Sequence, residues 1–596
     1  MLPNDLDEAK KYLKELEGEL SQKFKARNDQ IDGWRDLYFF RHHKDRSALP
    51  GETLINTGKP TNVVDLTVGI LTSNEMRIRA FTVGEETDET QHAASCVEKF
   101  CKGILYITNE KQEIELEALV NTCVARDGWA CIFGYWDPEI SVKDNAYGEL
   151  PTTLQLIDIK EIYYETGGPK GGYRSFIRSC SRTIRDIEDE WDVELDGYDS
   201  KNKSKTNVNY VDYWGWAKNE GKWVIENAIL ADGKHWVVEP RYIPQYAELP
   251  FTLFPGRLTN DPAPERAALS ILFPIERAVK DLEAQLSHQR RLVDLYSALP
   301  PVIETASGTE KPELDAALGK VVHLKQGDRF YFPTWPGSPP DMDRSISQTM
   351  EEVQEGSYYS SAYGAGTGGS GYGLSLQNDS GRIRLNQFQR NLERSWAIVF
   401  RKMLSLAARF APNQNLPVYG RLNGKPFVLG ITGGDMLGYR IDVEVRPQFP
   451  QDETRKTTIA AQLKAQDLLS ERTIQERYLD VDYPDVELDR KLKQMALQNP
   501  DLMRAKIMQV IQEQSPELAE LMMPKPQPQQ QQRNAEATMG QPPGLPGPGQ
   551  LPPSAVMPQE MVGIGPPQSV GQPPPGQMNP ELLAALQMMK GLPGVK

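Results

Sequence analysis

The chain has 596 residues, far more than the roughly 250–300 at which one hydrophobic core stops growing, so we expect two or more folded regions. The formal net charge is −15, from 67 basic and 82 acidic residues, and the sequence holds no Lys/Arg-rich run of the kind that neutralises phosphates. This composition argues against a protein that grips nucleic acid tightly or reads its sequence. A modest acidic excess that only keeps the protein soluble is an equally good interpretation.

The cysteines and the lack of long apolar runs indicate the compartment. An odd number of thiols, scattered within one third of the chain, predicts neither a disulfide framework nor the paired knuckles of a structural zinc site. We expect reduced thiols, several of them buried. The sequence contains no run of about 18 apolar residues, so we expect no transmembrane helix. The first residues lack the pattern of a signal peptide. We therefore expect folding in a cytoplasm and no membrane contact. The cysteines are Cys96, Cys101, Cys123, Cys131 and Cys180.

The first 260 residues predict a region of mixed helix and strand. Apolar residues recur at helical spacing over residues 5–27, where Asp5 can cap the helix. The aromatic run Trp129–Trp136 predicts a buried strand. Residues 152–255 are rich in strand formers between glycine-containing turns, so residues 30–260 are expected to form one α+β domain with a meandering β part. Further apolar-periodic stretches, the first predicted to be a helix, are Val63–Leu71, Cys96–Ile107 and Ile114–Val124. Strands are expected at Leu154–Ile159, Gly172–Ile177, Val208–Trp216, Trp223–Leu230 and His235–Val238, and a short helix at Thr183–Trp191.

Two long helices with a small β-containing segment between them are expected next. The first covers residues 264–299, and its near-heptad apolar stripe predicts a rod of about 45–50 Å. The second covers residues 341–361. The segment between them, residues 302–335, carries two short predicted strands, Val321–Leu324 and Arg329–Phe332.

A glycine-rich segment, Tyr363–Gly373, precedes a third long helix expected at Ile383–Phe410. A short pair of strands follows, Phe427–Ile431 with Tyr439–Val445, and two or three helices are expected within Glu453–Met523. The last 73 residues hold 17 of the 45 prolines and cannot bury enough apolar surface to offset the entropy of ordering. We expect a disordered tail there.

No motif for catalysis, a cofactor or a metal stands out in the sequence. The letters G-x-G-x-x-G occur at Gly364–Gly369, but a polar Tyr/Ser-rich stretch precedes them, where a dinucleotide-binding fingerprint needs a hydrophobic strand. A mobile loop is the better interpretation, and an enzyme with a dinucleotide cofactor at this segment is the alternative. The sequence holds no phosphate-binding loop and no catalytic histidine signature. His42 and His43 lie beside charged residues and are expected on a solvated surface. We therefore predict no catalytic, cofactor-binding or metal-binding residues and no cofactor.

The order of these segments resembles that of the portal proteins of tailed double-stranded DNA bacteriophages, most of all those of short-tailed phages. In that family a wing leads into a stem helix, a clip, a second stem helix, a tunnel loop, a long wing helix and a crown. The likeness spans about residues 30–520. One departure is the C-terminus: some short-tailed-phage portals end in a helical barrel, whereas this chain ends in a Pro/Gln-rich tail. Local sequences similar to the family are Trp34–Tyr38, Asn62–Val64, Asn74–Arg77, Asp127–Ala130, Tyr246–Phe251 and Ser370–Leu376.

The resemblance implies a division of the α+β chain into nine parts. These are an N-terminal helix (1–29), an α+β wing (30–263), a stem helix (264–299), a small β-containing clip (300–337), a second stem helix (338–362), a tunnel loop (363–381), a long wing helix with a β return (382–450), a helical crown (451–523) and a disordered tail (524–596).

The resemblance also implies a function and partners. The chain would form a ring, dodecameric in the family, at the unique vertex of a capsid, assembled in the host cytoplasm and retained in the virion. Double-stranded DNA would be packaged, retained and ejected through the ring without sequence-specific contacts. Implied partners are further copies of this chain, the terminase large subunit, the major capsid and scaffolding proteins, and head-completion or tail adaptor proteins. A ring-forming scaffold unrelated to phage is an alternative.

Two sets of residues are candidates for roles in such a ring. Arg290, Arg291 and Lys325 are the cations expected to face the channel, with plain surface charges as the alternative interpretation for these three. Candidates to face the DNA channel are Gly368, Gly369, Gly371, Tyr372, Gly373, Arg290 and Arg291. Candidates to dock terminase or adaptor proteins are Asp315, Lys320, Lys325 and Asp328.

Overall fold

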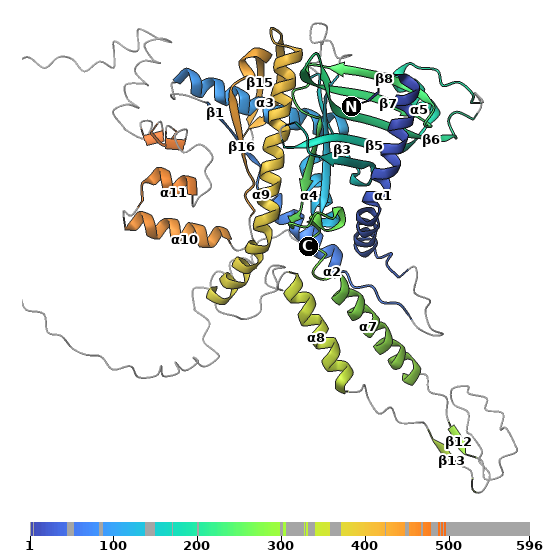
Figure 1. Ribbon diagram of the computed structural model, residues 1–596. Helices are drawn as coiled ribbons and strands as arrows, with labels where there is room; N and C mark the ends of the chain where they lie inside the picture. Colours follow the sequence, from blue (N-terminus) through green and yellow to red (C-terminus); the bar gives the residue numbers. More distant parts are fainter. Residues whose placement is uncertain are drawn as a thin grey trace, which may run out of the picture. The chain divides into compact units, whose positions relative to one another are not determined.

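The structure is a computed structural model of mixed helix and strand, which agrees with the predicted α+β class (Figure 1). The chain divides into two units, Met1–Arg490 and Lys491–Lys596, and nearly all described residues belong to the first. The structure describes residues 2–3, 5–43, 53–82, 88–137, 150–169, 171–198, 202–297, 302–304, 327, 329–331, 340–357, 371–422, 425–447, 452–466, 469–477 and a few between 487 and 495.

Helix α1 (Leu6–Tyr38) packs on a five-stranded sheet with its first half and enters the main core with its second half. Asp5 caps it as predicted, because its carboxylate accepts the backbone N–H groups of Asp7 (2.9 Å) and Glu8 (3.0 Å). The helix continues past residue 27, where the prediction ended it, because apolar residues keep the helical spacing. Those buried are Ala9, Leu13, Leu16, Leu20 and Phe24 in the first half and Ile31, Trp34 and Leu37 in the second.

The five-stranded sheet is an antiparallel meander in chain order, as the β-rich texture predicts. Helix α5 (Ile184–Trp191), capped by Thr183, buries Ile184 and Ile187 against residues of this sheet. Four strands correspond to predicted ones, whereas β4 was not predicted. The strands are β4 (Ile162–Thr166), β5 (Tyr173–Thr183), β6 (Asn207–Asn219), β7 (Lys222–Ala231) and β8 (His235–Ile243).

A three-stranded antiparallel sheet packs with several helices in the main core, which the second half of α1 also enters. The predicted buried strand Trp129–Trp136 is β2, and it lies at the centre of this sheet. None of the five cysteines forms a disulfide, and two of them, Cys101 and Cys131, are buried, as expected. Burial raises the pKa of the Cys131 thiol to about 12. The other elements here are β3 (Thr152–Ile157), β9 (Phe251–Pro255), α2 (Lys59–Leu71), α3 (Asp88–Gln112), α4 (Leu116–Asp127) and α9 (Gly371–Phe410).

Two C-terminal strands that were predicted to pair with each other pair with different partners. Strand β15 (Lys425–Thr432) forms a hairpin with β14 (Asn415–Leu422), and β16 (Tyr439–Glu444) pairs with β1 (Arg77–Thr82) from the N-terminal part of the chain. The predicted pairing is therefore wrong. Local composition shows that a strand exists, but the packing of the whole fold selects its partner.

The first of the two long helices predicted after the sheet is shorter than expected. In place of one helix over residues 264–299, the chain forms a short helix α6 (Pro264–Ala267), a two-residue strand β11 (Ala268–Leu269) paired with β10 (Arg257–Leu258), and helix α7 (Glu276–Ser297). The 22 residues of α7 span about 33 Å, less than the predicted rod.

Backbone contacts explain this interruption. The N–H of Ile271 donates to the carbonyl oxygen of Ala125 (3.0 Å), and the hydroxyl of Ser270 donates to the same oxygen (2.8 Å). These bonds hold the segment against the end of α4 in a non-helical conformation. Pro274 then lacks the N–H that an uninterrupted helix would need, so the helix begins only after it.

The segment between α7 and helix α8 (Pro340–Gly356) contains a small hairpin, β12 (Val302–Glu304) with β13 (Arg329–Tyr331). Strand β13 confirms the strand predicted near residue 329. Its partner is β12, which was not predicted, whereas Val321–Leu324 lies outside the described residues.

Helix α9 begins at Gly371 and not at the predicted Ile383. Gly371, Tyr372 and Gly373, predicted to belong to a loop, are therefore helical, while residues 358–370 lie outside the described part of the chain. A glycine in a helix costs about 1 kcal/mol relative to alanine. The cost is tolerated here because lengthening an existing helix adds a hydrogen bond per residue and needs no new nucleus.

The remaining described elements are helical. Helices α10 (Asp452–Ala465) and α11 (Glu471–Arg477) lie within the region predicted to be helical, while most of residues 478–523 and the whole predicted tail, 524–596, fall outside the description. Among the described helices, none combines the length and the apolar character needed to cross a membrane.

Candidate functional site

Helices α7 and α8 lie side by side and run in opposite directions (Figure 1). Gln285 of α7 donates to the hydroxyl of Ser345 (3.1 Å), and Gln289, one turn later, donates to Asp343 (3.1 Å), which comes earlier in α8. Later residues of α7 thus contact earlier residues of α8, so the two helices are antiparallel. The end of α7 and the start of α8 therefore lie at the same end of the pair, and the segment with hairpin β12–β13 must leave and return there.

The predicted channel residues lie on two different helices where they are described. Arg290 is on α7 and forms an ion pair with Asp294 (3.1 Å), and the half-buried Arg291 follows it. Gly371, Tyr372 and Gly373 open α9. The described contacts do not bring these two groups together. Gly368 and Gly369 lie outside the described residues, as do all four docking candidates, Asp315, Lys320, Lys325 and Asp328. Gly327 is described, and its φ of +100° is a backbone conformation that favours glycine.

The start of α7 is joined to the end of α1. The indole N–H of Trp34 donates to the carboxylate of Glu276 (3.0 Å), the first residue of α7. Lys280 holds the same carboxylate from one turn further along (2.7 Å). Because Trp34 is buried in the main core, this bond fixes the base of α7 to the body of the fold.

A network of charges joins α1 to the end of α4. The guanidinium of Arg35 contacts the carboxylates of Asp127 and Asp158, each at 2.8 Å, and Arg126 donates to Asp127 at 2.7 Å. Burial would raise the pKa of Asp158, but its hydrogen bonds from Arg35 and a backbone N–H outweigh that effect and lower it. A cavity of about 390 Å³ lies beside these groups. The charged groups that line it are largely paired with one another, so we assign it no chemical role.

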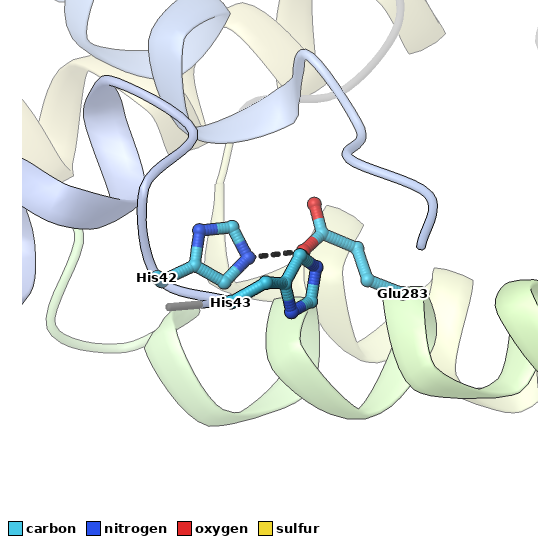
Figure 2. A group of neighbouring side chains, drawn as sticks. All are labelled: His42, His43 and Glu283. Atoms are coloured by element: carbon cyan, nitrogen blue, oxygen red, sulfur yellow. Dashed lines mark hydrogen bonds and ion pairs between the residues drawn. The ribbon is translucent and has the colours of Figure 1, made fainter. Parts of the chain in front are cut away.

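His42 and His43, expected on a solvated surface, lie against a buried carboxylate instead, so that expectation is wrong. Figure 2 shows the two imidazole rings, from the segment that follows α1, next to Glu283 of α7. The Nε2 atom of His42 is hydrogen-bonded to the Oε2 atom of Glu283, and Nε2 of His43 lies 3.3 Å from the same oxygen. The side chains are 4 % exposed for His42, 13 % for His43 and 0 % for Glu283.

A second segment of chain covers the other oxygen of Glu283. The backbone N–H and the hydroxyl of Thr57 both donate to Oε1, at 2.6 and 2.9 Å. The N–H of Ile55 donates to the hydroxyl of Ser287, one turn further along α7 (3.0 Å). Burial would raise the pKa of Glu283, but hydrogen bonds from His42 and Thr57 outweigh burial and hold this pKa below its usual value. Two hydrogen-bond donors on Oε1 and two imidazole rings beside Oε2 therefore surround this buried carboxylate.

One signal in the sequence points to this cluster. Glu283 follows Val279 by four residues and Leu282 by one, so it sits on the apolar stripe of the predicted helix. A carboxylate on such a face needs a buried partner. The partner residues are far away in sequence, so only the fold could identify them as His42 and His43.

No protein-family model matches the chain, and the search of curated proteins gives no match.

Proposed function

We propose that the chain is the subunit of a phage portal ring, a conduit for double-stranded DNA at one vertex of a capsid. The observation that carries the proposal is the antiparallel pair of α7 and α8 with the hairpin β12–β13 inserted between them. In the portal family two stem helices bracket a clip in this order. The long helix α9 follows, as a wing helix does, and packs on the central sheet.

The charge of the helix pair suits a conduit. Helix α7 carries four basic and four acidic residues, and α8 carries one basic and five acidic residues. A surface that neutralised phosphates would release about one condensed counterion per contact and hold the DNA tightly. The proposed ring needs DNA to slide, so a helix pair without a basic excess supports this role.

The proposal assigns partners by region. Residues between α7 and α8, the proposed clip, would dock the terminase large subunit and later the head-completion or tail adaptor proteins. The α+β part, the proposed wing, would contact major capsid and scaffolding proteins. The chain itself would carry out no chemical step and need no cofactor, and its site of action would be the virion.

Native mass spectrometry of the purified full-length chain tests the proposal. Twelve copies of 67.1 kDa make a ring of about 0.8 MDa, and closed symmetric rings are a common outcome of head-to-tail interfaces. A stable monomer would overturn the proposal and favour the alternative, an enzyme with a dinucleotide cofactor at Gly364–Gly369. A ring that has no phage partner would favour the second alternative, an unrelated scaffold.

A further inference from the structure

The side chains of His42, His43 and Glu283 form a compact group of potential metal ligands that the proposed function does not use. Each residue offers one ligand atom, and these atoms lie within 4.8 Å of one another. The three side chains converge from two separate segments, the chain after α1 and the middle of α7 (Figure 2). Their low exposure shields the group from water.

We propose that His42, His43 and Glu283 bind one divalent transition-metal ion, with zinc as the preferred ion. Two imidazole nitrogens and one carboxylate oxygen are a donor set that suits zinc in proteins. Zinc–nitrogen and zinc–oxygen bonds of about 2.0–2.2 Å place tetrahedral ligand atoms roughly 3.3–3.5 Å apart. The separation of 3.3 Å between Nε2 of His43 and Oε2 of Glu283 has this length. The Nε2 atom of His42 is hydrogen-bonded directly to the same oxygen, so this ring would move away from the oxygen when an ion binds.

Two buried imidazole rings face one oxygen of a buried carboxylate here. A divalent ion can join such a group, because it takes one nitrogen from each ring and one oxygen from the carboxylate. The Nδ1 atom of His42 is buried and has no hydrogen-bond partner among the described residues, so its contact with Glu283 through Nε2 is the only described polar contact of this ring.

The surroundings prepare the carboxylate for this role. Thr57 binds Oε1 of Glu283 through its N–H and its hydroxyl, which leaves Oε2 directed at the histidines. Such outer hydrogen bonds fix the orientation of ligands in metal sites and typically contribute 10–100-fold to affinity. Bound metal would therefore pin three parts of the chain together: the end of α1, the segment around Thr57, and α7.

The first experiment uses the full-length protein, stripped with a chelator, dialysed and titrated with zinc or cobalt(II) alone. We expect one zinc ion per chain by elemental analysis and a rise in melting temperature on zinc addition. Cobalt(II) in the site should give the visible absorption of a four-coordinate ion with nitrogen and oxygen ligands. Failure of the wild-type chain to retain zinc or to give this absorption would overturn the proposal, whatever its variants do.

Variants then locate the ion. His42→Ala and Glu283→Gln should each weaken zinc binding by at least about 100-fold, beyond the range typical for an outer contact. Thr57→Val removes only the hydroxyl contact and should weaken binding by about 10–100-fold. The control is His92→Ala, an exposed histidine on α3, which should leave binding unchanged.

Circular dichroism shows whether each variant is folded. If the ligand variants unfold, Thr57→Val and the wild-type titration together still test whether the ion binds at Glu283. Equal binding in wild type and Thr57→Val, or loss of binding in His92→Ala, would place the ion elsewhere and overturn the assignment. The proposal is independent of the portal function, because none of these measurements requires a ring or DNA.

Discussion

At Gly128, both the backbone conformation and the close packing of neighbouring backbone atoms disfavour any side chain. It ends α4 with a left-handed φ of +73°, and a Cβ atom placed on it would lie 2.8 Å from the backbone nitrogen of Ser270 and 2.9 Å from the backbone carbon of Leu269. Both neighbours are backbone atoms, which cannot rotate away. The residue therefore fixes how the chain before α7 meets the end of α4.

Gly128→Ala should lower the free energy of unfolding by at least about 2 kcal/mol, because positive φ and the steric contacts both penalise a side chain. The control is Gly18→Ala, in the exposed middle of α1 with no atom within 4 Å of the added Cβ, which should be neutral or stabilising by up to about 1 kcal/mol. Urea denaturation of both variants measures the difference. Equal stability of the two would refute the role given to Gly128.

Asp212 is a buried carboxyl group on β6 that makes stability depend on pH. Burial raises the pKa of this carboxyl group. The nearby charge of Arg178 and a hydrogen bond from Asn227 lower it only in part, so the resulting pKa is about 6. The unfolded value is about 3.9, so between pH of about 4 and 6 the folded state binds more protons than the unfolded state. The contribution of this group to stability therefore falls as pH rises through that window.

Asp212→Asn should remove this contribution. We expect the variant to be more stable than wild type at pH 7.5 by on the order of 1–3 kcal/mol, with the gain vanishing near pH 4. The measurement is the urea midpoint at several pH values, with the exposed Asp189→Asn as the control. A gain that does not change with pH would contradict the buried titration.

At the scale of elements, the charge network of Arg35 decides how α1 meets α4. The side chain of Asp127 is 1 % exposed and forms ion pairs with both Arg35 and Arg126. Arg35→Ala should cost about 2–4 kcal/mol, since it leaves a buried carboxylate with one partner only. Arg185→Ala, which breaks an exposed pair within α5, should cost no more than about 0.5 kcal/mol. Thermal melts compare the two, and a similar small effect for both would show that the network is not structural.

The sequence was sufficient for elements with their own periodicity and insufficient for contacts between distant segments. The helical spacing of apolar residues predicted the first part of α1, and the aromatic run Trp129–Trp136 predicted β2, because both signals are local. The pairing of β16 with β1 joins residues more than 350 positions apart, and no local pattern encodes it. The predicted helix over residues 264–299 is interrupted before α7 because the hydroxyl of Ser270 donates to the carbonyl oxygen of Ala125. This is likewise a tertiary contact that no local pattern encodes. The cluster of His42, His43 and Glu283 was missed for the same reason.

At the scale of the whole molecule, exposed apolar side chains give the proposed ring an interface to test. Ile383 in the first half of α9 is 71 % exposed, and Phe273, just before α7, is 45 % exposed. Both line one groove of about 420 Å³. Apolar groups of this size in a groove are typical of surfaces that become buried on association, and in a ring the neighbouring copy of the chain would cover them.

Ile383→Asp should therefore shift the protein from the ring to smaller species, because a charge would be buried at the interface without a partner. The matched control is Asn386→Asp, an exposed residue on the same helix, which adds the same charge outside the groove. Sedimentation velocity separates ring from monomer. An unchanged ring in Ile383→Asp, or equal disruption by both variants, would rule out this groove as the interface.

The central claim, that this chain forms a conduit, is tested most directly by electron microscopy of the purified full-length protein. We predict a single population of closed rings with an open central channel, and symmetry averaging should give a subunit number that matches the native mass of about 0.8 MDa expected for twelve chains of 67.1 kDa. Monomeric particles, or assemblies without a central channel, would contradict the claim.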